Sequence, residues 1–333
     1  MNNKNILITG GTGSFGQKFV ETCLLKFKPK KIIIYSRDEL KQFEMDNKFK
    51  KFKNYKCLRF FLGDVRDLSR LNSAMEDVDY VIHAAALKQV PTAEYNPDEA
   101  IKTNIKGAQN VIDASLASGV KKVIALSTDK AAAPINLYGA TKLVSDKLFI
   151  SSNNIRGKKN ISFSVVRYGN VMMSRGSVIP FFQSEKNKGS LPITDKEMTR
   201  FNITLEEGVN FVLKVLKIMV GGELFVPKIP SLRIMDLAKA IAPKAKIKIT
   251  GLRPGEKIHE EMITETDGLS TYEFKDYFVI TSDFKYTLVA KKGLTNHLIS
   301  MGGKKCKRGF SYKSNSNKTF LTVSQIKNIL KKN

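Results

Sequence analysis

The chain has 333 residues, 42% of them hydrophobic, with 22 glycines and 10 prolines. This composition supports a folded core in one large or two ordinary domains and excludes a long disordered or fibrous region. Lysine and arginine total 56 against 31 acidic residues, so the formal net charge is +25. Such a charge favours anionic ligands such as nucleotides, although a solvated lysine-rich surface also accounts for it.

The sequence lacks the features of an exported or membrane-spanning chain. The first apolar run starts at Asn5, which leaves no room for a signal peptide, and no apolar run approaches the roughly 20 residues of a spanning helix. The three cysteines (Cys23, Cys57 and Cys306) are far apart, as reduced thiols in a cytoplasmic protein would be. The segment 48–53 interleaves Phe with Lys and could stack on single strands, but it is more typical of a helix end. We therefore expect neither a membrane partner nor a specific nucleic acid.

Strand and helix patterns alternate through the first half of the chain. The predicted strands are 5–9, 31–35, 58–62, 80–83, 123–127 and 161–166, and the predicted helices include 15–25, 97–118 and 137–151. Apolar strands separated by helices imply a parallel sheet covered on both faces. With right-handed crossovers this is an α/β, Rossmann-type doubly wound sheet, whose ligands bind beyond the carboxyl ends of the strands.

The pattern changes after residue 170. Residues 191–199 look like a loop, 205–219 like a helix, and 222–226 like a strand that rejoins the main sheet. We expect a Rossmann domain over 1–170 and a smaller C-terminal lid over 171–285 that binds substrate. A divergent basic tail is expected over 286–333.

A glycine-rich turn joins the first strand to the first helix. Glycines at 10, 13 and 16 let backbone N–H groups approach a pyrophosphate, and the helix N-terminus adds partial positive charge. The spacing Gly-x-x-Gly-x-x-Gly at this place predicts a dinucleotide site. The expected contacts in this turn are Gly10, Thr12, Gly13, Ser14, Phe15 and Gly16.

The end of the second strand bears on which dinucleotide binds. Ser36 and Arg37 could hold a 2′-phosphate, with Lys41 one turn further, so we expect NADP; Asp38 is the feature that would suit NAD. Further cofactor contacts are expected from residues near the carboxyl edge of the sheet and on the elements beside it. They are Asp64 and Val65, beside the adenine, and Ala84, Ala86, Lys88, Asn104 and Val171.

Tyr138 and Lys142 lie four residues apart on a predicted helix and therefore on one face. A free tyrosine titrates near 10, and we expect the nearby ammonium, together with the positive nicotinamide ring, to favour the phenolate, which would make Tyr138 a general base. Thr128 could hydrogen-bond the reacting hydroxyl. Asp129 and Lys130 follow at the carboxyl end of the fifth strand.

The glycine turn, Tyr138 and Lys142 resemble the extended short-chain dehydrogenase/reductase superfamily. The stretches 35–39, 63–67, 83–97, 125–132, 136–146 and 167–170 look like the inverting UDP-N-acetylglucosamine 4,6-dehydratases, which open pseudaminic acid biosynthesis in flagellated bacteria. Lys130 is the discriminating residue, since related retaining dehydratases carry Glu at this place. This resemblance extends from residue 4 to about 285.

The resemblance implies that Tyr138 deprotonates the sugar 4-hydroxyl while a hydride passes from C4 to NADP. Lys130 then removes the C5 proton and Asp129 protonates the departing 6-hydroxyl, before the hydride returns to C6 and C5 is inverted. For these roles we expect that, in the bound state, the pKa of Lys130 falls and that of Asp129 rises.

The resemblance also assigns the nucleotide sugar to residues of both predicted domains. These are Lys88, Asn170, Ser177, Val178, Thr194, Arg200, Arg253 and Glu256, the two arginines suiting the diphosphate. It suggests a homo-oligomer, and no metal site is expected because His83 and His259 have no second ligand at suitable spacing.

The sequence departs from the family pattern at several places. Met173 stands where a glycine is usual, Asn202 stands where tryptophan is usual, and the segment 182–190 looks shortened. Two alternatives stay open. An epimerase or reductase of the same superfamily would need Tyr138 and Lys142 but neither Asp129 nor Lys130, and a basic protein that binds NADP or nucleic acid would have no turnover.

Overall fold

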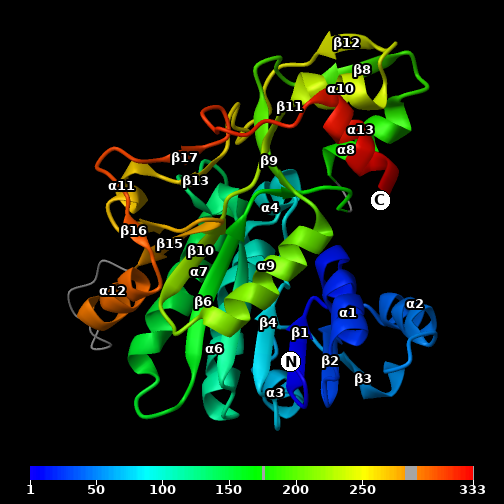
Figure 1. Cartoon of the computed structure of the whole chain (residues 1–333). Helices are drawn as coiled ribbons and strands as arrows, with labels where there is room; N and C mark the ends of the chain where they lie inside the picture. The colour runs from blue at the N-terminus through cyan, green and yellow to red at the C-terminus, as the bar shows by residue number, and fades with distance from the viewer. Residues whose placement is uncertain (175–176, 282–290, 333) are drawn as a thin grey trace.

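The computed structural model describes residues 1–174, 177–281 and 291–332. A ten-stranded sheet forms its centre (Figure 1). Its strands, in spatial order, are β16 (Lys304–Lys305), β14 (Thr271–Glu273), β15 (Tyr277–Thr281), β10 (Glu223–Pro227), β6 (Ser162–Tyr168), β5 (Lys122–Thr128), β4 (Tyr80–His83), β1 (Asn5–Thr9), β2 (Lys31–Ser36) and β3 (Leu58–Leu62). The seven strands from β3 to β10 run parallel, which confirms the doubly wound class. The strand expected near 222–226 does rejoin the sheet, beside β6.

Helices cover both faces of the sheet, as its continuous apolar strands require. They are α1 (Ser14–Lys26), α2 (Glu39–Phe49), α3 (Leu68–Ala74), α4 (Val90–Tyr95), α5 (Pro97–Ile101), α6 (Gly107–Ala117), α7 (Leu137–Ile155) and α9 (Leu205–Ile218). Helix α1 contacts α9, whereas α6 contacts α3 and α7. A π-helical turn over Lys102–Lys106 joins α5 to α6, so the long helix predicted over 97–118 is nearly continuous. Within the described residues no helix is long and apolar enough to cross a membrane.

A smaller lobe lies beyond the carboxyl edge of the sheet, at the top of Figure 1. It contains α8 (Val178–Glu185), β8 (Ser190–Ile193), α10 (Ile234–Ile241), β12 (Lys246–Ile249) and α13 (Val323–Lys332), around its own hydrophobic core. Strands β7 (Asn170–Val171), β9 (Thr199–Ile203) and β11 (Ser231–Arg233) form a sheet of their own beside this lobe. The loop predicted over 191–199 was partly wrong, because Leu191 and Ile193 are buried and β8 pairs with β12.

The C-terminal segment, expected as a basic tail, is folded against both lobes. Residues 282–290, where that tail was expected to begin, lie outside the described residues. Beyond them come α12 (Lys291–Ser300), β16, β17 (Tyr312–Lys313) and α13. Strand β16 extends the main sheet, β17 pairs with β13 (Glu261–Ile263), and α13 packs on α10 in the smaller lobe. The last segment of the chain therefore connects the sheet edge with the smaller lobe.

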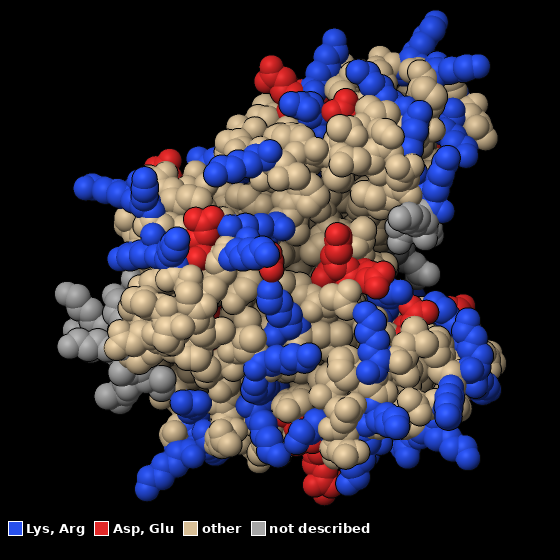
Figure 2. Space-filling view, in the orientation of Figure 1, with Lys and Arg blue, Asp and Glu red and all other residues tan. Residues whose placement is uncertain are grey.

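Lysine and arginine side chains are spread over the whole face seen in Figure 2. They do not gather there into a single stripe, which is the arrangement typical of a nucleic-acid groove. On this face the basic charge looks like a solvated surface common to both lobes.

Candidate active site

A cavity of about 1610 Å³ lies between the carboxyl edge of the sheet and the smaller lobe. Most residues expected to contact cofactor or substrate line it. They are Gly10, Thr12, Gly13, Ser14, Phe15, Gly16, Ser36, Arg37, Asp38, Lys41, Asp64, Val65, Ala84, Ala86, Lys88, Thr128, Lys130, Tyr138, Lys142, Asn170, Val171, Ser177, Val178, Thr194, Arg200, Arg253 and Glu256. Two expected residues, Asn104 and Asp129, lie behind its wall. The fold thus brings distant segments to one large cavity.

The glycine turn forms a close-fitting backbone cradle at one end of the cavity. Gly10 has a φ of +65°, and a Cβ there would lie 2.9 Å from the Ala85 backbone. A Cβ on Gly16 would lie 2.3 Å from the carbonyl oxygen of Gly11, so α1 packs directly on the turn. The N-cap of α1, Gly13, makes no side-chain capping bond. The positive end of the α1 dipole therefore lies at this turn, where it would favour an anion such as a pyrophosphate.

Charged residues at the end of β2 form the rim of the cavity. The carboxylate of Asp38 accepts from the Lys41 backbone N–H at 3.0 Å and so caps α2. Arg37 extends towards Asp64, with 3.5 Å between guanidinium and carboxylate, and about half of its side chain is exposed. The Ser36 hydroxyl accepts from Gln42 at 3.0 Å. Asp38 thus has a structural role, while Arg37 stays accessible from the cavity.

Asn104 shapes the wall of the cavity from behind. Its side chain is buried, accepts from the Leu87 N–H at 2.8 Å, and donates to the Leu87 carbonyl at 2.9 Å and the Thr141 hydroxyl at 3.0 Å. These bonds tie the segment after β4 to α7. Both ends of its amide are thus used within the protein and Asn104 is absent from the cavity lining, while the expected cofactor contact stays a prediction.

Asp129 and Lys130, the expected acid and base, lie directly after β5 on a short 3₁₀ helix, Asp129–Ala131. This helix is called the catalytic turn. The Thr128 hydroxyl donates to Asp129 Oδ1 at 3.0 Å and accepts from the Lys130 N–H at 3.3 Å. Helix α7 packs directly against this turn, because a Cβ on Gly139 would lie 2.2 Å from the Lys130 carbonyl oxygen. This close packing places Tyr138 beside Thr128, to which it hydrogen-bonds.

Opposing effects set the pKa of Tyr138. Burial raises its pKa to about 12, against the opposing effects of the Lys130 charge and the Thr128 hydrogen bond. The Lys142 ammonium is itself buried, which lowers the pKa of that lysine. Desolvation therefore outweighs the charges around the phenol in this structure. The lower pKa expected from Lys142 together with a positive nicotinamide ring stays a prediction for the bound state.

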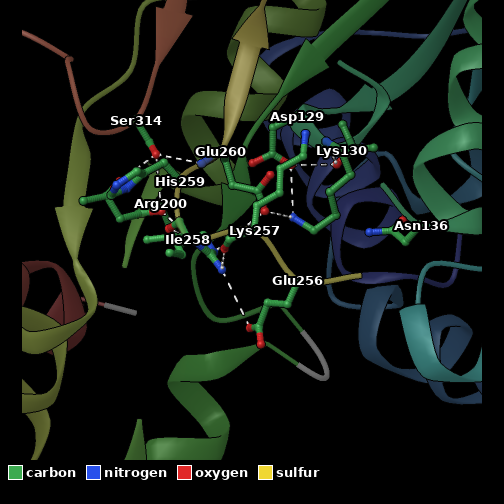
Figure 3. Close-up of polar contacts among 12 residues, drawn as sticks. Asp129, Lys130, Asn136, Arg200, Glu256, Lys257, Ile258, His259, Glu260 and Ser314 are labelled. Carbon is green, nitrogen blue, oxygen red and sulfur yellow. Dashed lines mark hydrogen bonds and ion pairs between the residues drawn. The ribbon is translucent and has the colours of Figure 1, made fainter. Parts of the chain in front are cut away.

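Lys130 lies between two buried carboxylates (Figure 3). Its ammonium donates to Glu260 Oε1 at 2.7 Å and to Asp129 Oδ1 at 3.2 Å. Asp129 is 0% exposed and Glu260 is 2% exposed. Glu260 lies 130 residues after Lys130 in the sequence, just before β13, and β13 packs on the catalytic turn. Sequence reasoning missed it, although an acid flanking a short strand in a basic chain was a weak signal.

Burial and these charges set the protonation of the cluster. Burial, reinforced by the Glu260 charge, raises the pKa of Asp129, as its expected role as an acid requires. Burial alone would lower the pKa of Lys130, but Asp129 and Glu260 together raise it above its ordinary value. The two carboxylates thus oppose the fall in the pKa of Lys130 that is expected when substrate and cofactor are bound, and that fall stays a prediction. The second carboxylate could not be read from the sequence.

Arg200, expected at the diphosphate, is mostly engaged with the protein backbone. Its guanidinium donates to the carbonyls of Thr199 (2.7 Å), Ile258 (2.8 Å) and Lys257 (2.9 Å), as Figure 3 shows. It is 6% exposed and lies 3.8 Å from Glu260. Arg253, by contrast, is exposed at the cavity. Arg200 therefore holds the 257–260 segment in place, and Arg253 is the more accessible cation.

The remaining sequence expectations concern metal and packing. Within the described residues no cluster of His, Cys, Asp and Glu could hold a metal, and His259 shares a hydrogen bond with Thr199 at 2.9 Å.

Met173 has a φ of +59°, a conformation that favours glycine, and packs against the core of the smaller lobe. It is absent from the cavity lining, so it strains the loop rather than crowding the cavity. Asn202 is buried in β9.

Comparisons with known proteins agree with this architecture. Residues 6–282 match the family described as "Polysaccharide biosynthesis protein". The chain is 56% identical to a UDP-N-acetylglucosamine 4,6-dehydratase (inverting) of Campylobacter jejuni, over 99% of this chain and 98% of that protein. It is 43% identical to a UDP-glucose 4-epimerase of Rickettsia canadensis, over 84% of each. The X-ray structure of Pen from Bacillus thuringiensis superposes with a TM-score of 0.88 at 37% identity, covering 100% of this chain and 99% of that one. The chain belongs to the polysaccharide biosynthesis protein family and, within it, to the inverting UDP-N-acetylglucosamine 4,6-dehydratases.

Proposed function

We propose that this protein is an NADP-dependent hydro-lyase that dehydrates UDP-N-acetylglucosamine with inversion at C5. The product would be UDP-2-acetamido-2,6-dideoxy-β-L-arabino-hexos-4-ulose, at the first step of pseudaminic acid biosynthesis. The observation that carries the proposal is that Lys130 and Tyr138 line the cavity that also contains the glycine cradle, while Asp129 lies behind its wall and pairs with Lys130. The named Campylobacter relative supports the reaction and the substrate.

The residues at the first turn fit a nicotinamide dinucleotide phosphate. A Cβ at Gly10 would fill the cradle, and α1 begins at the same turn, so the glycine backbone and the positive end of the helix dipole would hold the pyrophosphate. Asp38 is used as the cap of α2, which leaves Ser36 and Arg37 to hold a 2′-phosphate. A nicotinamide held there would supply the redox chemistry, as the acceptor for a hydride from the sugar C4 and the donor of that hydride to C6.

The protein's own groups then move the protons. Tyr138, hydrogen-bonded to Thr128, takes the proton of the 4-hydroxyl. The resulting 4-ketone acidifies the hydrogen at C5, which Lys130 removes as a proton. Asp129, whose pKa burial raises, gives its proton to the departing 6-hydroxyl, and water leaves. A proton added to C5 on the opposite face inverts that centre.

A test of this function uses the purified protein with UDP-N-acetylglucosamine and NADP in deuterated water, with the product read by NMR. We expect a 6-deoxy-4-keto sugar with deuterium at C5 and the L-arabino configuration. A D-xylo product would overturn the inversion. A sugar still hydroxylated at C6 but inverted at C4 would instead support an epimerase, the activity named for the Rickettsia relative.

The oligomer and the cellular compartment stay predictions. The family resemblance suggests a homo-oligomer, which light scattering of the purified protein would test directly. A cytoplasmic location remains an expectation from the sequence.

A further inference from the structure

The cluster around Lys130 contains one carboxylate more than the proposed chemistry uses. Asp129 has a role as the acid, whereas Glu260 has none, yet it makes the shorter contact to Lys130 (2.7 Å against 3.2 Å). It is 2% exposed. Burying a second carboxylate is costly unless it is paired, so its place beside the lysine needs an explanation.

Glu260 is fixed from several sides. Its backbone N–H donates to the Ser314 hydroxyl at 2.9 Å, and the Ser314 N–H donates back to its carbonyl at 2.8 Å. The Ser314 hydroxyl also lies 2.7 Å from the Thr199 hydroxyl. The C-terminal segment and β9 thus hold the backbone of Glu260, while its carboxylate extends towards Lys130 (Figure 3). Such fixation leaves the carboxylate little freedom to retreat from the lysine.

We propose that Glu260 is a positioning residue, which anchors the Lys130 ammonium beside Asp129 and sets how protons are shared between these two reacting groups. The proposal rests on the proposed function for its catalytic meaning. Its geometry is independent of that function. Without Glu260, the Lys130 side chain keeps a single carboxylate partner, 3.2 Å away on the adjacent residue.

The electrostatic consequence has a definite sign. The negative charge of Glu260 favours the charged form of Lys130 and disfavours the charged form of Asp129, so it raises the pKa of both. Other charged or titratable groups facing the cluster are Arg200 from β9, Lys257 from the preceding loop, and Tyr138 from α7. Removing the charge of Glu260 leaves these other groups in place. It should therefore lower the pKa of both Lys130 and Asp129.

The test compares the wild type with Glu260→Gln, which keeps the shape but not the charge, and with Glu260→Asp, which keeps the charge. Glu261→Gln is the matched control, because Glu261 carries the same charge one residue away but pairs with Lys313 at 3.7 Å and does not line the cavity. Circular dichroism and thermal unfolding establish that each variant is folded.

The first readout does not depend on turnover. A pulse of acetic anhydride at several pH values, followed by peptide mass spectrometry, gives the pH dependence of Lys130 acylation in the purified protein. We expect the midpoint to fall by about one pH unit or more in Glu260→Gln, and to stay within a few tenths of a unit in Glu261→Gln. An unchanged midpoint in folded Glu260→Gln would overturn the proposal.

The second readout uses the dehydratase reaction. If Lys130 must be neutral and Asp129 protonated, both limbs of the kcat profile should move to lower pH in Glu260→Gln, and Glu260→Asp should restore them in part. A fall in kcat with both limbs unmoved would assign Glu260 a merely structural role. If the wild type does not convert UDP-N-acetylglucosamine, the proposed function fails, while the acylation experiment still decides the role of Glu260.

Discussion

Tyr138 and His83 show how strongly burial decides the chemistry of single residues in this protein. Tyr138 lies on α7 and His83 lies at the end of β4, and in both residues burial disfavours the charged form of the side chain. Burial raises the pKa of Tyr138 to about 12 and lowers that of His83 to about 3, the latter with help from the Lys142 charge. The spacing on a helix identified Tyr138 and Lys142, but it could not predict the burial that shifts their pKa values.

Replacing Tyr138 with Phe tests the base at the 4-hydroxyl. The variant keeps the ring but has no group to accept the proton, so we expect kcat for UDP-N-acetylglucosamine to fall about 10²- to 10⁴-fold. NADP affinity, measured by calorimetry, should change less than about threefold, since the cradle lies in another segment. Retention of near-wild-type kcat in Tyr138→Phe would remove this tyrosine from the mechanism.

His83 predicts a pH dependence of stability rather than of activity. Its ring shares a hydrogen bond with Thr9 at 2.8 Å and is buried against Phe149. The folded pKa of about 3 lies below the ordinary 6.5, so the unfolded chain binds the extra proton first as pH falls. The stabilisation is complete above pH 6.5 and is lost at about 1.4 kcal/mol per pH unit below it.

The variant His83→Asn should remove that dependence. Urea unfolding at pH 7.5 and pH 5 should show that the wild type loses about 2 kcal/mol more than the variant between these two values. Comparing the two proteins cancels the titration of all the carboxylates that they share. Equal losses in both would mean that His83 takes up its proton in the folded protein at the same pH as in the unfolded chain, so that its pKa is not lowered by folding.

At the scale of elements, the first βα unit was predictable and the final segment was not. The strand β1, the glycine turn and the helix α1 follow one another directly in the sequence, so the pattern of each supports the prediction of the other two. Glu260 meets Lys130 only because β13 packs on the catalytic turn, across a separation of 130 residues. Likewise, α13 completes the core of the smaller lobe with Ile326, which is 0% exposed, although the tail looks merely basic in sequence.

The glycine cradle after β1 can be tested by adding a methyl group at Gly10, with the same substitution at Gly119 as the control. Gly10→Ala adds a Cβ at 2.9 Å from the Ala85 backbone and strains a residue whose φ is +65°. Gly119→Ala carries a similar backbone strain, at a φ of +72°, but its Cβ would have nothing within 4 Å. We expect each to lose about 1–2 kcal/mol of unfolding free energy from that strain, with a further loss for Gly10→Ala.

NADP binding separates the two glycine variants. Gly10→Ala should bind NADP at least about tenfold more weakly, because the backbone that faces the pyrophosphate must shift. Gly119→Ala should bind it as the wild type does, since Gly119 follows α6 and is absent from the cavity lining. Equal affinities for both variants would show that the cradle tolerates a side chain and would place the pyrophosphate elsewhere.

At the scale of the whole molecule, the net charge of +25 is the property that the fold explains least. Figure 2 shows basic side chains over both lobes on the visible face, without one dominant stripe. A diffuse positive field raises the encounter rate of an anionic nucleotide sugar without adding a specific contact. The same field would hold nucleic acid weakly and without sequence preference.

These two uses of the charge respond differently to salt. If the field only assists capture of the nucleotide sugar, the KM for UDP-N-acetylglucosamine should rise severalfold between about 50 and 300 mM salt, while kcat changes little. Anisotropy of a labelled single strand should show binding that weakens steeply over the same range and does not compete with the sugar nucleotide. Binding to the strand with this steep salt dependence, together with the absence of turnover, would instead favour a basic protein that binds nucleic acid and has lost catalysis. A flat KM with full turnover would mean that the lysines and arginines are a solvated surface with no part in capture.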